Sequence, residues 1–72
     1  MEQTANKEYA PHQQRVVDEK NELQDKFSKL GTFILDNPIF ATLDSEEQID
    51  LQSQHDVMGT YLDILERRIS RF

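Results

Sequence analysis

Apolar residues recur at helical spacing along two stretches of this chain, and one stop separates them. The first stripe consists of Val16, Leu23, Phe27, Leu30 and Ile34. Its spacings of seven, four, three and four residues are those of one face of an α-helix. The sequence Asp-Asn-Pro at 36–38 ends the pattern, because the residue before a proline is pushed out of the helical region. We therefore predict a first helix over residues 11–36.

The second stripe begins after a short apolar segment at 38–43, which we predict to be a turn. Asp44 or Ser45 is suited to cap the following helix, with Gln48 placed as in a capping box. Glu46 and Glu47 complement the positive end of the helix dipole. The apolar positions that follow are Leu51, Met58, Leu62, Leu65, Ile69 and Phe72. We predict a second helix over residues 45–72.

Two helices joined by so short a turn must lie side by side and run in opposite directions. The predicted fold class is all-α: an antiparallel two-helix hairpin forming a single domain over residues 10–72. Two glycines and two prolines among 72 residues agree with a helical fold. Residues 1–9 are polar and without periodicity, so we interpret them as a mobile arm in which Tyr9 has a docking role.

The apolar arc of the second helix is wider than one partner helix covers. Val57, Tyr61 and Ile64 extend the arc to roughly 160°. Left in water, such side chains would each forgo about 1.5–3 kcal/mol of burial. We therefore expect the hairpin to associate with itself, as a dimer or a larger helical bundle.

Polar residues also recur at intervals of seven within or beside the apolar arcs. They are His12, Glu19 and Lys26 on the first helix and Gln54, Tyr61 and Arg68 on the second. A turn near residues 41–42 makes Glu19 a partner for Arg68 and places His12 close to Phe72. One interpretation is structural, because buried polar pairs fix helix register and oligomeric state. The other is that these residues belong to a binding site.

Charge is distributed unevenly along the chain. The net charge is −6, and residues 36–56 contain acids but no lysine or arginine. All four arginines fall near the outer ends of the helices, which the hairpin brings together. The candidate ligand-binding residues are His12, Arg15, Glu19, Tyr61, Arg67, Arg68 and Arg71. Arginine suits bidentate phosphate contacts and aromatic rings stack on bases, so the predicted ligand is a small phosphorylated nucleotide.

Other functional classes lack the residues they need. The chain has no cysteine, no helical pair of metal ligands and no glycine-rich phosphate loop, so we expect no enzyme activity, no metal and no cofactor. The net charge argues against binding to nucleic acid. No apolar run approaches the roughly 20 residues that span a bilayer, and the N-terminus does not match a signal peptide. We expect a soluble, cytoplasmic protein without a membrane partner.

Several segments together resemble a widespread family of short phage and prophage proteins related to a small crAss-like-phage protein. They are PHQQRVVDEKNEL, PIF, the Met58–Tyr61 pair and the terminal RI..F, and the resemblance covers residues 9–72. It implies a phage accessory protein that acts in the cytoplasm of the infected host. By analogy with other small helical phage proteins, it implies a sponge for the cyclic nucleotides or ADP-ribose-derived signals of CBASS or Thoeris defence.

Two alternatives remain open from the sequence. In the first, the helical bundle binds a host or phage protein, and the acidic segment from Asp44 to Asp50 is the contact surface. In the second, the chain is a self-assembling structural or regulatory protein, and Arg68 serves only to fix the assembly.

Overall fold

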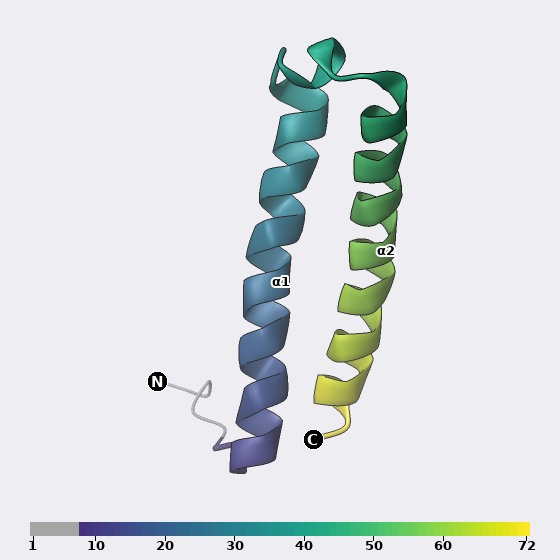
Figure 1. The fold of residues 1–72 in the computed structure, drawn as a ribbon. Helices are drawn as coiled ribbons and strands as arrows, with labels where there is room; N and C mark the ends of the chain where they lie inside the picture. The colour runs from purple at the N-terminus through teal and green to yellow at the C-terminus, as the bar shows by residue number, and fades with distance from the viewer. Residues whose placement is uncertain (1–7) are drawn as a thin grey trace.

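Two long helices and one short turn make up the fold of the computed structural model, which describes residues 8–72 (Figure 1). Helix α1 spans Pro11–Asp36, the 3-10 turn η2 spans Phe40–Thr42, and helix α2 spans Ser45–Ser70. The helices lie antiparallel, which confirms the predicted all-α hairpin. Most of the predicted N-terminal arm, residues 1–7, lies outside the described part of the chain.

Helix α1 begins and ends at residues that supply the missing hydrogen bonds of a helix terminus. Pro11 occupies the first turn, where a proline needs no N–H partner. The Ala10 N–H donates to Oε1 of Gln13 at 2.9 Å. At the other end, Asn37 leaves the helical conformation with φ −90° and ψ 121°, as expected before a proline. Its side-chain Oδ1 accepts from the Ile39 N–H at 2.9 Å and shapes the turn.

Helix α2 begins at a true side-chain cap. Oδ1 of Asp44 accepts from the Glu47 N–H at 2.9 Å, so the cap is Asp44 and not Ser45. The predicted capping box through Gln48 is not formed, because its amide donates to the Leu43 carbonyl at 2.8 Å and so ties the helix to the preceding turn. Helix α2 ends at Ser70, two residues before the predicted end at 72.

The core is a narrow seam between the two helices. Val16, Leu62 and Leu65 are buried, and Leu65 is completely covered. From Leu51 to the C-terminus, the residues that are not exposed follow alternating steps of four and three residues, with Gly59 as the exception. They are Leu51, His55, Met58, Leu62, Leu65, Ile69 and Phe72. This spacing is that of an antiparallel coiled-coil contact. The seam therefore includes His55, a polar residue.

Phe27 and His55 form the central contact of this seam. Their rings stack with centroids 4.1 Å apart and planes 10° from parallel. The two glycines flank this pair: a Cβ on Gly31 would lie 2.9 Å from Nε2 of His55, and one on Gly59 would lie 3.3 Å from Cε1 of Phe27. The glycines thus leave the room that the two rings occupy between the helices.

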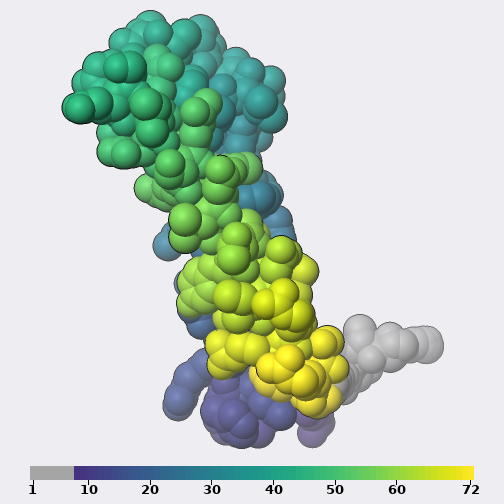
Figure 2. Space-filling view, turned by 90° about the vertical axis from the view of Figure 1, so that its right-hand side faces the viewer, coloured from purple at the N-terminus to yellow at the C-terminus, as the bar shows by residue number. Residues whose placement is uncertain are grey.

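A second apolar strip lies on the side of α2, about 70–130° around the helix from the seam. Val57 is 67% exposed, Ile64 is 40% exposed and Tyr61 is 39% exposed. The molecule is long and thin (Figure 2), with extents of 47 × 23 × 16 Å, and no other element of residues 8–72 covers this strip. Neither helix of the described chain is long and apolar enough to cross a membrane.

Candidate ligand-binding site

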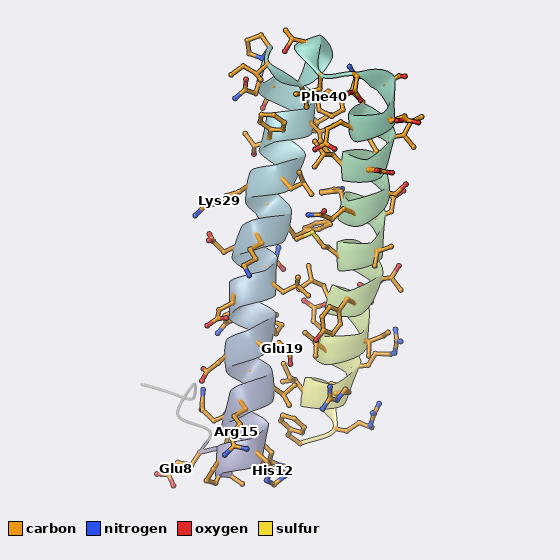
Figure 3. The ribbon with its side chains drawn as sticks, viewed as in Figure 1. Glu8, His12, Arg15, Glu19, Lys29 and Phe40 are labelled. Atoms are coloured by element: carbon orange, nitrogen blue, oxygen red, sulfur yellow. The ribbon has the colours of Figure 1, made fainter. Side chains whose placement is uncertain are left out.

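The hairpin brings the start of α1 and the end of α2 to the same end of the molecule (Figure 1). His12, Arg15 and Glu19 follow one another up the first turns of α1 from that end (Figure 3). Arg67 and Arg68 occupy the last turn of α2, and Arg71 is its C-terminal cap residue. The arginines of the candidate site therefore lie at one end, as the sequence predicted.

The Phe27–His55 stack fixes which levels of the two helices face each other. In an antiparallel pair, a step up one helix matches a step down the other. Arg68 lies 13 residues beyond His55, so the stack places it level with about residue 14 of α1. The approach of Gly59 to Phe27 places it level with about residue 18. Arg68 thus lies between the levels of Arg15 and Glu19, within about one helical turn of each.

A shallow groove of about 480 Å³ marks one of the two flanks of the hairpin. It is lined by Gln24 of α1 and Asp63 of α2, among other residues. At 100° per residue, Arg15 lies about 180° around α1 from Gln24, and Glu19 about 140°. On α2, Arg68 lies about 140° from Asp63. Arg15, Glu19 and Arg68 are therefore on the flank opposite this groove.

The remaining candidates divide between the two flanks by the same geometry. His12 lies about 120° from Gln24, and Tyr61 about 160° from Asp63, so both are on the flank of Arg15 and Arg68. Tyr61 is seven residues before Arg68, about 10 Å toward the middle of the molecule. Arg71 is one turn from Arg68. Arg67 lies only about 40° from Asp63 and is not part of this flank.

The expected polar contacts within the seam are not formed. Glu19 and Arg68 are both exposed. Among residues 8–72 the ion pair present is Asp25–Lys29, at 3.0 Å. His12 is exposed, and Phe72 contacts the ring of Tyr9, so Phe72 is not a free stacking surface.

Within the described chain, the seven candidate side chains form no hydrogen bond or ion pair with one another, and all seven residues are exposed. The arginines in the last turn of α2 also complement its negative end, which is worth about 0.3–1 kcal/mol per charge at an exposed site. This charge interaction with the helix end does not occupy the N–H donors of the guanidinium groups. Arg15, near the start of α1, has no such stabilising role, because cations disfavour the positive end of a helix.

A groove that the sequence did not indicate lies nearer the turn, between Gly31 and His55. Its volume is about 360 Å³, and its lining includes Ile34, Leu35 and Gln52. His55 belongs to the four-three spacing that contains Leu51 and Met58, and this spacing is the sequence signal for its place in the seam. Within residues 8–72, no three potential metal ligands gather in one place.

These features define a small helical hairpin whose arginines lie exposed at one end, unpaired within residues 8–72. The Sequestin family model matches residues 10–71, so the chain belongs to the Sequestin family. The family's name indicates the sequestering of a molecule. Neither the curated proteins nor the solved structures gave a match.

Proposed function

We propose that this protein is a non-enzymatic accessory protein of a phage, which binds and sequesters a nucleotide-derived immune signal. The observation that carries the proposal is the placement of Arg15 and Arg68 on one flank within about one helical turn of each other, both exposed and neither paired within residues 8–72. Two guanidinium groups so placed present donors for the phosphates of one small ligand. Membership of the Sequestin family supports a role in holding a molecule.

The neighbouring side chains supply the other contacts that a nucleotide needs. Tyr61 offers an aromatic face for a base, about 10 Å from Arg68. The carboxylate of Glu19 accepts hydrogen bonds from ribose hydroxyls or base amino groups and disfavours bare phosphate, which gives selectivity. His12 lies in the first turn of α1, where the helix end favours anions.

The ligand class in this proposal is a cyclic oligonucleotide or an ADP-ribose derivative. Such signals activate bacterial defence of the CBASS and Thoeris types, and the resemblance to short phage proteins supports that setting. The protein would act in the cytoplasm of the infected bacterium. Binding alone lowers the concentration of free signal, so the function requires no catalytic group.

We further propose that the working form is a self-associated hairpin. The support is the second apolar strip of α2, where Val57, Tyr61 and Ile64 remain exposed in the single chain. A second copy on this strip would bury these side chains. It would also deepen the shallow flank of Arg15 and Arg68 into a groove between copies.

A thermal-shift screen tests the ligand proposal. Cyclic dinucleotides, cyclic trinucleotides and cyclic ADP-ribose isomers are added to the protein one at a time. A ligand at 100 times its Kd stabilises the fold by about 2.7 kcal/mol, a readily measured shift for so small a chain. No shift with any of these probes at millimolar concentration would count against the proposal.

A second candidate function is supported at the other end of the hairpin. Leu35 is 82% exposed, Ile39 is 56% exposed and Ile49 is 59% exposed, close to the acids of the first turn of α2. Exposed apolar side chains beside acids suit contact with a basic protein surface. Pull-down from host lysate with Glu46→Lys/Glu47→Lys tests this: a partner lost in that variant supports the candidate, and a retained partner excludes this surface.

A further inference from the structure

The exposed face of α2 carries opposite charges at its two ends and apolar residues between them. We call this face the outer stripe. It comprises Asp50, Gln54, Val57, Tyr61, Ile64, Arg68 and Arg71. At 100° per residue these positions fall within about 100° of one another, on a face centred about 100° around α2 from the seam. All seven residues are exposed.

When the outer stripe is read in the opposite direction, apolar residues fall on apolar residues and the acid falls on an arginine. Val57 and Ile64 lie equally far from a centre beside Tyr61, and Asp50 and Arg71 are equally far from the same centre, with opposite charges. The acid lies toward the turn and the arginines toward the open end. A stripe of this kind is complementary to itself when the second copy runs in the opposite direction.

We infer that two copies of this chain pair through their outer stripes, antiparallel, about a two-fold axis beside Tyr61. This inference rests on the self-association proposed above and specifies its geometry. Asp50 of each copy faces Arg71 of the other, so one ion pair closes each end of the interface. Val57 of each copy packs on Ile64 of the other, and Tyr61 of each copy lies beside the axis, opposite Thr60 of the other.

Charge selects this arrangement over the parallel one. In a parallel pair Asp50 would face Asp50 and Arg71 would face Arg71, and like charges placed opposite one another destabilise an interface. The antiparallel pair places Asp50 opposite Arg71 at both ends of the interface. A two-fold interface also closes on itself and leaves no copy of the stripe free, so it yields a dimer and not a filament.

The antiparallel register leaves Arg68 opposite Ser53 of the second copy, a neutral residue. The charge of Arg68 is therefore available for a ligand, whereas Arg71 is used by the dimer. The two arginines thus have separate roles that separate experiments can distinguish. Ligand binding is read from variants of Arg15 and Arg68, and dimerisation from variants of Asp50 and Arg71.

A charge swap tests the pairing by analytical ultracentrifugation. Asp50→Arg alone and Arg71→Asp alone should each weaken the dimer by about tenfold or more, because each leaves like charges facing at both ends. Combined in one chain, the two changes should restore the dimer to within about threefold of the unchanged protein. Asp63→Arg, the same charge change on the opposite flank, serves as the control and should leave the dimer intact. A monomeric unchanged protein, or a double variant no stronger than the single ones, overturns the inference.

Cysteine cross-linking tests the direction of pairing and does not depend on the charge variants. The chain has no cysteine of its own. Val57→Cys and Ile64→Cys proteins, mixed and oxidised, should form the mixed disulfide in preference to either homodimer. Self-linking of Val57→Cys in preference to the mixed product indicates parallel pairing and overturns the inference. Because neither variant touches Arg15 or Arg68, these outcomes stand whether or not a nucleotide binds.

Discussion

Phe27 of α1 and His55 of α2 stack face to face across the hairpin, 4.1 Å apart and 10° from parallel. This pair sets the register of the two helices, and the register decides which residues of the open end meet. It brings Arg68 within about one helical turn of Arg15. A contact at the middle of the hairpin therefore positions the candidate site at its end.

Replacing His55 with alanine should lower the free energy of unfolding by about 1–3 kcal/mol. The change removes a stacked ring pair, worth about 0.5–1.5 kcal/mol beyond its buried area, and leaves space beside Gly31. Urea denaturation followed by circular dichroism measures the loss. Gln54→Ala, at the neighbouring exposed position, is the control and should change stability by less than about 0.5 kcal/mol. Equal effects of the two substitutions would show that the stack does not stabilise the hairpin.

The two glycines should respond differently to alanine. Each substitution gains about 1 kcal/mol of helix propensity. A Cβ at Gly59 meets Phe27 at 3.3 Å, a contact that small movements relieve, whereas a Cβ at Gly31 meets the stacked ring of His55 at 2.9 Å. Gly59→Ala should therefore be the more stable of the two variants by thermal melting. In a His55→Ala background the difference should shrink, and a Gly31→Ala variant more stable than Gly59→Ala would contradict the close approach.

Leu65→Ala should be the most destabilising single truncation among the leucines. Leu65 is completely buried, and truncating a buried leucine costs about 2–5 kcal/mol. Leu35→Ala removes the same atoms at a position that is 82% exposed and should change stability by less than about 0.5 kcal/mol. Chemical denaturation of both variants checks the pair, since comparable losses are incompatible with the seam described here.

Asp44→Ala should lower stability by about 1 kcal/mol, because it removes the acceptor of the Glu47 N–H at the start of α2. Ser45→Ala lies one residue further along and removes no capping bond, so it is the matched control. Thermal melts of the two variants distinguish the caps that the sequence left open. A larger loss of stability for Ser45→Ala than for Asp44→Ala would contradict the assignment of Asp44 as the cap.

Sequence periodicity was sufficient for the fold class, because the stripe from Val16 to Ile34 and the stop before Pro38 permit only a helix that ends there. It also indicated the apolar strip of Val57 and Ile64, which the hairpin leaves exposed. These features depend on local spacing, because residues three, four and seven apart lie on the same side of a helix.

The register between the helices followed from the turn near residues 41–42 to within about two residues, as the contacts of Phe27 with His55 and Gly59 show. The expected pair of Glu19 and Arg68 is not formed, and both side chains are exposed. The hydrogen bonds of Asn37 and Gln48 at the turn, and the stacking of the His55 ring on Phe27, required the structure, because they depend on side-chain conformations that residue spacing does not specify.

The central claim is that Arg15 and Arg68 hold one phosphorylated ligand. Isothermal titration calorimetry of the nucleotide that gives the largest thermal shift tests it most directly, using the unchanged protein, Arg15→Ala, Arg68→Ala and the control Lys29→Ala, whose side chain points away from α2 (Figure 3). We predict that each arginine variant loses at least about tenfold in affinity while its circular dichroism spectrum is unchanged, and that Lys29→Ala binds normally. Equal affinities for all four proteins would contradict the account.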